Sequence, residues 1–286
     1  MTDALTVLIA REGLPGEYRD QVARWWRPLA AEIAAWRRAA GRPLVVGING
    51  AQGSGKTTLC AFLTEILLPE LGLTAVTLAL DDFYLPRAER GALARDIHPL
   101  LATRGVPGTH DVAAGIAVLD ALKTGDGRTV EFPVFDKSRD DRAATPRAII
   151  ADADVILFEG WCVGASPQPA EALSKPINAL EAEEDRDGRW RGHVNDVLSA
   201  GYARWFAEID RLVMLRPPDF AAVLANRQAQ ETKLRARTGR GMTTDEVARF
   251  VQHYERLTRA MFAEMPDRAD LTFLIDARQR VIARSP

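Results

Sequence analysis

The sequence has few of the features that mark a secreted, membrane or metal-binding protein. It contains only two cysteines, Cys60 and Cys162, and their positions do not suit a metal site. No uncharged apolar run approaches the roughly 18 residues needed to span a bilayer. Asp3 and the absence of a basic flank argue against a signal peptide. We therefore expect a reducing compartment, no membrane partner and a cytoplasmic location.

The chain also lacks an excess of charge of either sign. Its formal net charge is −2 and its pI is about 6.1, so no overall positive field indicates a nucleic-acid partner. It has no internal repeats and no low-complexity tract. With 47% hydrophobic and 27% charged residues, the composition is ordinary for a globular protein. The length of 286 residues suits one large domain or two small ones.

What the sequence does contain is a phosphate-binding loop. Residues 50–57 fit the pattern G-x-x-x-x-G-K-[ST], after an expected strand at 44–48 and before an expected helix at 58–68. Glycines let successive N–H groups turn inward at a helix N-terminus and hold phosphate. Lys56 would reach the β- and γ-phosphates, and the Thr57 hydroxyl would bind Mg²⁺. The expected nucleotide-binding residues are Gly50, Ala51, Gln52, Gly53, Ser54, Gly55, Lys56, Thr57 and Thr58.

Acidic residues stand at two other strand ends. An expected strand at 73–80 runs directly into Asp81 and Asp82, and ligands of open α/β sheets bind at the carboxyl ends of strands. The alternative is that this pair caps the next turn. The apolar stretch Asp154–Gly160 ends in Glu159, and in phosphate-loop proteins an acid at this place lies near Mg²⁺. These acids are the candidates for catalysis and metal binding.

The rest of the chain alternates helices with strands, which predicts a parallel sheet covered by helices on both faces. Helices are expected at 17–40, 112–122, 195–209, 219–237 and from 243 onward, and further strands at 211–215 and 271–275. The segment 129–135 is extended, and Pro133 favours a sheet edge. Residues 165–190 resemble a surface insertion whose acidic run at 181–187 would be a solvated face.

The helix expected at 219–237 is apolar in its first half, whereas its second half carries Arg227 and several other charged residues. Arg227 and Glu231 are spaced i,i+4, so one explanation is an exposed, salt-bridged helix. We favour a mobile lid over residues 226–242 that brings arginines over a phosphoryl group in transfer, because two glycines follow as hinges.

We predict one P-loop NTPase-type α/β domain over residues 1–286, with an N-terminal helical segment at 1–42 and the lid at 226–242. The acid pair and the lid suit transfer of the γ-phosphoryl group of ATP, with Mg²⁺, to a small-molecule hydroxyl. No obligate protein partner is evident. The alternative from another class is a nucleotide-binding regulatory protein without an acceptor, but such a protein has no need of Asp81.

Several of these segments resemble a known family. The phosphate loop, the tip Asp81–Tyr84 and the stretch Phe158–Gly160 resemble the superfamily of phosphoribulokinase, uridine kinase and pantothenate kinase. More closely, the chain is similar to the D-glycerate 3-kinase group of plants, with its fungal and bacterial relatives. This likeness rests on residues 52–57, 104–111, 133–138, 157–161, 178–180, 210, 227–231 and 241–242.

The resemblance implies roles for individual residues. Asp81 would activate the acceptor hydroxyl, Asp82 would serve Mg²⁺ or substrate, and Glu159 would lie on the Mg²⁺ side. The catalytic set would be Lys56, Asp81 and Arg227. The implied reaction converts D-glycerate to 3-phosphoglycerate, while a nucleoside or a pantothenate-like alcohol stays open as acceptor. Because glycerate carries a carboxylate, its pocket needs a cation or hydrogen-bond donors. The implied substrate residues are Asp81, Tyr84, Arg104, His110, Asp111 and Lys137.

Overall fold

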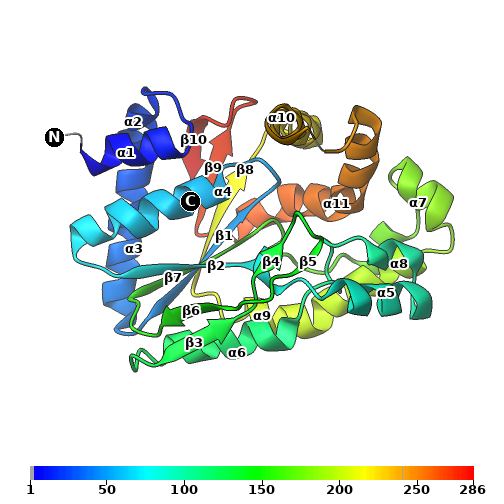
Figure 1. Cartoon of the computed structure of the whole chain (residues 1–286), viewed down its shortest axis with the longest axis horizontal. Coiled ribbons are helices and arrows are strands. Elements are labelled where there is room, and N and C mark those ends of the chain that lie inside the picture. Colours follow the sequence, from blue (N-terminus) through cyan, green and yellow to red (C-terminus); the bar gives the residue numbers. More distant parts are fainter. Residues whose placement is uncertain (1–2, 240) are drawn as a thin grey trace.

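A computed structural model describes residues 3–239 and 241–286, apart from the side chains of Arg237 and Thr238 (Figure 1). Arg240, inside the predicted lid, lies outside the described residues. Within the described chain, the central sheet has six strands in the order β10-β9-β8-β1-β7-β2. These are β1 (Leu44–Gly50), β2 (Ala75–Ala79), β7 (Val155–Gly160), β8 (Arg211–Arg216), β9 (Leu271–Ile275) and β10 (Val281–Ser285).

Neighbouring strands of this sheet run parallel, except β9 and β10, which are antiparallel. The predicted parallel sheet is thus confirmed, and β10 is an edge strand that the sequence pattern did not reveal. Side chains of a strand alternate between the two faces of a sheet. Val45 accordingly enters one core, whereas Leu44 and Val46 enter the other.

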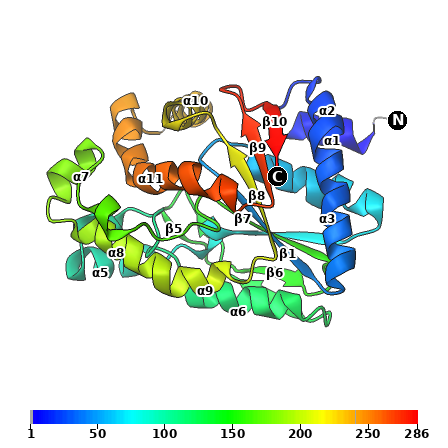
Figure 2. The ribbon, with the colours of Figure 1, turned by 180° about the vertical axis from the view of Figure 1, so that it is seen from behind.

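Helices cover both faces of the sheet, as predicted. One core is closed by α6 (Val112–Lys123), α8 (Arg189–Val197), α9 (Ala203–Phe206) and α11 (Thr244–Glu264), which lie to the left of the strands and below them in Figure 2. The other core is closed by α1 (Ala4–Arg11), α3 (Arg27–Ala40) and α4 (Lys56–Phe62).

The N-terminal helical segment lies in the positions predicted for it, but in several pieces. Residues 17–40 form α2 (Tyr18–Gln21), a π-helical turn at 22–26 and α3, which ends at Gly41 in the left-handed region with φ 65°. Trp25 and Trp26 meet Phe273 of β9 edge to face, at 6.4 and 5.2 Å between ring centroids. These tryptophans therefore pack the segment onto its own sheet. The pattern missed α1.

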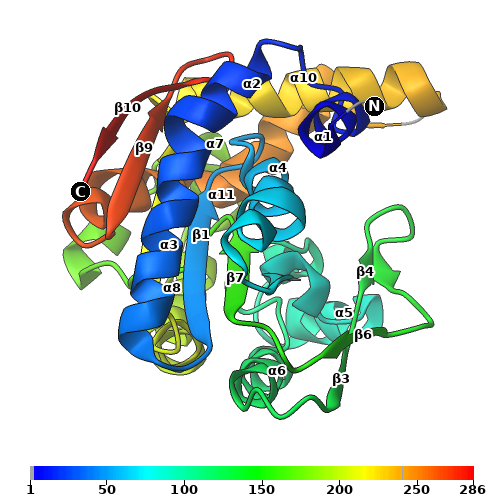
Figure 3. The same ribbon diagram turned by 90° about the vertical axis from the view of Figure 1, so that its left-hand side faces the viewer.

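The prediction of an extended edge strand at 129–135 is confirmed for 129–132, but this strand lies in a small two-stranded sheet and not in the central one. Here β3 (Thr129–Phe132) pairs with β6 (Arg147–Ile150), and β4 (Phe135–Asp136) pairs with β5 (Asp141–Arg142). Pro133 falls between β3 and β4, where its missing N–H costs no strand pairing. Figure 3 shows β3, β6 and β4 standing to one side of the central sheet, on the side of α5 (Arg87–Asp96).

The prediction that the acidic run at 181–187 is a solvated face holds for 182–184 and 186–187, but it is wrong for the two other residues. Glu181, in α7 (Ala179–Glu184), and Asp185 are both fully buried. Both oxygens of Glu181 accept hydrogen bonds from Arg256 of α11, at 2.7 and 2.6 Å. The local pattern misleads because the arginine that neutralises Glu181 comes from a helix far along the chain.

The last two long helices agree with their predicted positions. α10 (Phe220–Thr238) lies across the carboxyl ends of β1 and β8 (Figure 1). It ends at Gly239, which is left-handed with φ 69°. A capping box between Thr243 and Glu246 opens α11. No helix in the described part of the chain is long and apolar enough to cross a membrane.

Candidate active site

The phosphate loop joins β1 to the N-terminus of α4. Gly53 and Gly55 adopt φ of 74° and 91°, a region that favours glycine. A β-carbon on Gly53 would lie 2.9 Å from the β-carbon of Asn226 on α10. Lys56 donates a hydrogen bond from Nζ to the carbonyl of Ala51 at 3.3 Å, so the lysine folds over the loop. The glycines thus permit both the turn of the loop and the close approach of α10.

The loop and the facing helix α10 carry buried polar groups that have no hydrogen-bond partner among the described residues. These are Ser54 Oγ, Gln52 Oε1 and Asn226 Nδ2. Buried polar groups are normally paired. The Ser54 hydroxyl and the Asn226 amide N–H can donate hydrogen bonds to a phosphate, as can the N-terminus of α4 at Lys56. Gln52 Oε1 is an acceptor and cannot bind phosphate in this way.

Thr57 and Glu159, each of which the sequence assigns to Mg²⁺, lie together. The Thr57 hydroxyl donates a hydrogen bond to Glu159 Oε1 at 3.0 Å. Glu159 ends β7 and is 9% exposed. Burial raises the pKa of this carboxyl, and the nearby charge of Lys56 opposes that shift. A hydroxyl beside a carboxylate is a hard oxygen donor set that suits Mg²⁺.

Asp82 faces another part of the site. Its Oδ1 accepts a hydrogen bond from the backbone N–H of Phe135 at 3.4 Å, at the start of the β4–β5 hairpin. Burial raises the pKa of Asp82. No hydrogen bond joins Asp82 to Thr57 in the described chain, so this geometry favours the hairpin side over the metal side for Asp82.

Asp81 is the centre of the second half of the site. It follows β2 in a short 3-10 turn over Leu80–Phe83. Its Oδ1 accepts a hydrogen bond from the Tyr84 hydroxyl at 2.9 Å, and its Oδ2 forms an ion pair with Lys137 at 2.6 Å. Burial raises the pKa of Asp81, but the Lys137 charge and these hydrogen bonds outweigh it and lower the pKa to about 2. The carboxylate is therefore ionised at neutral pH.

His110 stacks on Tyr84, with 4.5 Å between ring centroids. Its Nδ1 lies 2.6 Å from the hydroxyl of Tyr202, which accepts a hydrogen bond from the N–H of Gly108. The Tyr202 proton is then available to Nδ1, which leaves the imidazole proton on Nε2. Burial lowers the pKa of His110 to about 3. His110 is thus a neutral group rather than the cation that the sequence left open, and its buried Nε2 has no partner among the described residues.

Two further predicted substrate residues already have partners within the chain. Arg104 pairs with Asp140 and lies over the ring of Phe135 at 5.3 Å. Asp111 caps α6 by accepting a hydrogen bond from the N–H of Ala114 at 3.0 Å, and it pairs with Arg142 at 3.0 Å. The contacts of Asp111 favour a structural role, in which it ties the hairpin to α6.

Arg227, predicted as a lid arginine, has partners within the protein. It pairs with Glu231 at 2.6 Å and lies 5.8 Å from the ring centroid of Phe250. Glu231 is only 4% exposed and accepts a hydrogen bond from the N–H of Met242 at 2.7 Å. The alternative of an exposed salt-bridged helix is therefore wrong for Glu231, whose burial the i,i+4 spacing could not reveal.

The sequence missed two site residues. Asn226 of α10 touches the phosphate loop at Gly53, and Tyr254 of α11 donates a hydrogen bond to the carbonyl of Arg104 at 3.0 Å. The signal for Asn226 was its place at the start of the predicted lid. Nothing in the pattern distinguished Tyr254 from the other apolar positions of its helix.

A cavity of about 530 Å³ adjoins the outer side of the phosphate loop. It lies between the N-terminal helices and the turn that joins β9 to β10. Its walls include Tyr18, Trp25, Ser54, Gly55, Thr58 and Arg278. An aromatic and cationic lining of this size can accommodate a flat heterocycle beside the phosphates.

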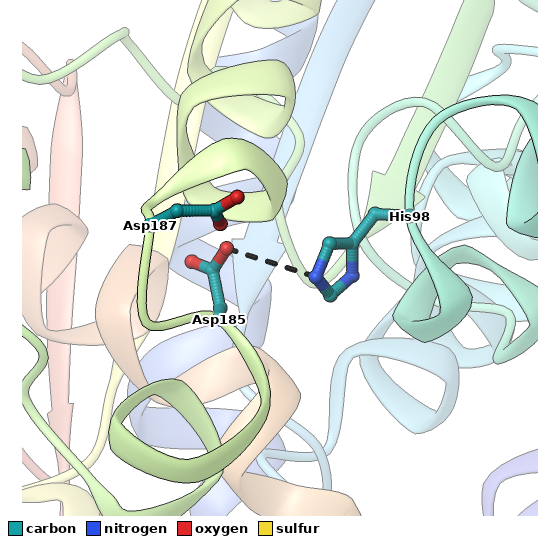
Figure 4. Close-up of side chains that lie close together, drawn as sticks. All are labelled: His98, Asp185 and Asp187. Carbon is teal, nitrogen blue, oxygen red and sulfur yellow. Dashed lines mark ion pairs between the residues drawn. The ribbon is translucent and has the colours of Figure 1, made fainter.

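A separate cluster of His98, Asp185 and Asp187 has its potential ligand atoms within 4.8 Å of one another (Figure 4). Asp185 already pairs with Arg191 at 2.8 Å. His98 Nδ1 accepts a hydrogen bond from the N–H of Leu100 at 3.3 Å, so its proton is on Nε2, which faces Asp185 at 3.9 Å. Both groups are satisfied internally, and the cluster fits a structural contact better than a metal site.

Comparisons with known proteins find kinases among the relatives of this chain. No family model matches the chain. It is 37% identical over 228 residues to a protein of Schizosaccharomyces pombe named uncharacterized kinase mug58, covering 75% of this chain and 79% of that protein. It is 34% identical over 243 residues to the chloroplastic D-glycerate 3-kinase of Arabidopsis thaliana, covering 80% of this chain and 50% of the plant protein. The solved structure of D-glycerate 3-kinase from Cryptococcus neoformans superposes with a TM-score of 0.77 at 27% identity, covering 91% of this chain and 97% of that chain.

The fold, the phosphate loop and these relatives define a P-loop kinase, an ATP-dependent phosphotransferase that acts on a hydroxyl group. Within that class, the chain belongs to the D-glycerate 3-kinase group.

Proposed function

We propose that the protein phosphorylates D-glycerate at its 3-hydroxyl with ATP, giving ADP and 3-phosphoglycerate. The observation that carries this proposal is the ion pair of Asp81 and Lys137 at the carboxyl end of β2. It offers an acid for the hydroxyl and a cation for the carboxylate of one small hydroxy acid. The names of the plant and fungal relatives support the same acceptor.

In this mechanism the acceptor hydroxyl hydrogen-bonds to Asp81 and attacks the γ-phosphorus in line. The bond from the γ-phosphorus to the β–γ bridging oxygen breaks, ADP leaves with that electron pair, and the hydroxyl proton passes to Asp81. An ordinary carboxylate suffices, because the transition state is loose and needs little base strength. Lys56 neutralises charge on the β- and γ-phosphates, and the imidazole N–H of His110 is available to a substrate oxygen.

We assign Thr57 and Glu159 as the residues that hold Mg²⁺. When bound, the ion neutralises phosphate charge and fixes the phosphate orientation. We assign Asp82 to the acceptor side. The buried hydroxyl of Ser54, which has no partner in the part of the chain that the structure describes, supports phosphate binding in this half of the site. The hydroxyl–carboxylate pair of Thr57 and Glu159 supports metal binding there.

We propose that the adenosine of ATP occupies the cavity between the N-terminal helices and the β9–β10 turn. The cavity opens beside Ser54, Gly55 and Thr58, at the loop that would hold the phosphates. Trp25 and Tyr18 offer faces for stacking, and Arg278 offers hydrogen-bond donors.

We also propose that residues 1–286 act as one kinase domain and that 226–242 is its lid. In this proposal Arg227 leaves Glu231 and turns to the phosphates when ATP binds. Finally, we propose a cytoplasmic enzyme that needs neither a protein partner nor nucleic acid. Turnover by the purified chain alone, and fractionation of cells, test these two points.

The substrate proposal is tested by ADP release from MgATP with D-glycerate, L-glycerate, uridine or pantothenate as acceptor. We expect stimulation by D-glycerate and 3-phosphoglycerate as the product, identified by mass spectrometry and NMR. Stimulation by uridine or pantothenate instead would replace the acceptor within the kinase class. A lack of stimulation by any of them would overturn the glycerate assignment.

A further inference from the structure

We propose that Lys137 masks Asp81 until an acceptor with its own carboxylate draws the lysine away. The enzyme would then select anionic acceptors, because only these draw Lys137 away and so make the carboxylate of Asp81 available as the base. The inference deepens the proposed function and rests on it for the identity of the acceptor.

Both oxygens of Asp81 are occupied. Oδ1 accepts the hydrogen bond of Tyr84 at 2.9 Å, and Oδ2 is paired with Lys137 at 2.6 Å. A substrate hydroxyl must lie within hydrogen-bond distance of one of these oxygens to be oriented and deprotonated. One of the two partners therefore has to leave before the transfer.

Lys137 is the partner that is able to leave. Tyr84 is 3% exposed and is held by stacking on His110 and by an edge-to-face contact with Phe135. The side chain of Lys137 is 62% exposed, and its ammonium sits on a flexible four-carbon stem. Displacing Tyr84 would break a buried aromatic cluster, whereas displacing Lys137 requires only rotation about side-chain bonds.

The hairpin that carries Lys137 is fixed to the body of the protein on both sides. Before it, Phe135 packs on Tyr84. After it, the carbonyl of Asp140 accepts a hydrogen bond from Arg90 at 2.7 Å, and Arg142 donates to the carbonyl of Tyr84 at 3.0 Å. The backbone therefore stays in place while the lysine side chain changes partner, which distinguishes this switch from a flap that opens.

The exchange favours an acceptor whose carboxylate lies next to its hydroxyl. Separating Lys137 from Asp81 without replacement leaves the Asp81 carboxylate, whose side chain is only 33% exposed, without its counter-charge, which is costly. A hydroxy acid supplies a new anion for the lysine and at the same time places its hydroxyl at the vacated Oδ2. A neutral alcohol supplies only the hydroxyl. Like a neutral alcohol, water supplies no anion for Lys137. The ion pair therefore also suppresses hydrolysis of ATP when no acceptor is bound.

The test uses Lys137→Met in the full chain, with Arg139→Met as the matched control, because Arg139 is an exposed cation of the same hairpin. The acceptors are D-glycerate and its neutral amide, D-glyceramide, and ADP release without acceptor is measured beside them. We expect the wild type to prefer D-glycerate by about 100-fold or more in kcat/KM. In Lys137→Met that preference collapses, D-glyceramide turnover rises above the wild-type value, and acceptor-free hydrolysis rises several-fold. Arg139→Met behaves like the wild type, and Lys137→Arg keeps most of the preference.

An equal loss with both acceptors in Lys137→Met, without a rise in acceptor-free hydrolysis, would overturn the mask and leave Lys137 a structural residue. A wild type that ignores D-glycerate, beside a Lys137→Met variant with raised hydrolysis, would refute the proposed acceptor but support the mask. If the wild type ignores D-glycerate and Lys137→Met shows no rise in acceptor-free hydrolysis, both the proposed acceptor and the mask are refuted. A thermal melt of each variant excludes loss of folding as the cause.

Discussion

Thr57 and Glu159 stand 102 positions apart in the sequence and are joined by a hydrogen bond of 3.0 Å. The sheet order creates this contact. β1 and β7 are parallel neighbours, with Ile48 opposite Glu159, so the acid at the end of β7 lies beside the loop that follows β1. A parallel sheet thus brings the hydroxyl of one strand–loop unit to the carboxylate of another at the same edge.

Replacing Glu159 by glutamine removes the negative charge but keeps the side chain's size. We expect kcat to fall by about 100-fold or more, with a higher Mg²⁺ concentration needed for half-maximal rate. Asp82→Asn is the comparison, because we place Asp82 on the acceptor side. Titrations of activity against Mg²⁺ for both variants measure this. If Asp82→Asn shifts the Mg²⁺ requirement and Glu159→Gln does not, the two assignments must be exchanged.

The lid proposal predicts that Arg227 acts after ATP binds. Arg227→Ala should lower kcat by about 100-fold and change the KM for the acceptor much less, because the arginine would meet charge that develops during transfer. Arg235→Ala, on an exposed part of the same helix, should stay near the wild type. Hydrogen exchange across 226–242, with and without a non-hydrolysable ATP analogue, follows the motion itself. Equal rates for both alanine variants would contradict a role for Arg227.

His110 predicts a loss of stability in mild acid. Its pKa is about 3 in the folded state, whereas the ordinary value is 6.5. Below pH 6.5 His110 becomes protonated in the unfolded chain, whereas its imidazole stays neutral in the folded protein. The free energy of unfolding therefore falls as pH drops towards 3, by at most about 1.4 kcal/mol per pH unit.

Replacement of His110 by glutamine should therefore reduce the difference in unfolding free energy between pH 7 and pH 5 by up to about 2 kcal/mol. Urea unfolding at the two pH values measures this difference. His253, whose pKa burial lowers to about 4, supplies part of the remaining slope. The low pKa of Asp81 acts only below pH 4 and does not enter this range. An unchanged slope in the variant would mean that His110 is protonated in the folded protein.

The buried pair of Glu181 and Arg256 predicts a large stability effect away from the site. Glu181→Ala leaves the guanidinium of Arg256 buried without its counter-charge, and we expect a loss of about 3–5 kcal/mol. Glu183→Ala, two residues on and exposed, should change stability by less than about 0.5 kcal/mol. Chemical unfolding of both variants decides this, and similar small losses for the two would show that the pair contributes little.

Local patterns predicted what depends on neighbours in sequence. The strand–loop–helix unit around Lys56 and the acids at strand tips follow from short motifs and from the parallel topology. Contacts between distant segments were not predictable in this way. The burial of Glu181 depends on Arg256, and the neutrality of His110 depends on its buried place beside Tyr202. The ion pair of Asp81 and Lys137 depends on a hairpin whose pairing no periodicity revealed.

In the proposed mechanism, Asp81 is the group that orients the acceptor hydroxyl and takes its proton. The most direct test is the rate of D-glycerate phosphorylation by Asp81→Asn, measured with saturating MgATP and beside the affinity for a non-hydrolysable ATP analogue. We expect the rate to fall by about 10²–10⁴-fold while nucleotide affinity stays close to that of the wild type. A rate within a few-fold of the wild type would contradict the assignment of Asp81 and, with it, the mechanism proposed here.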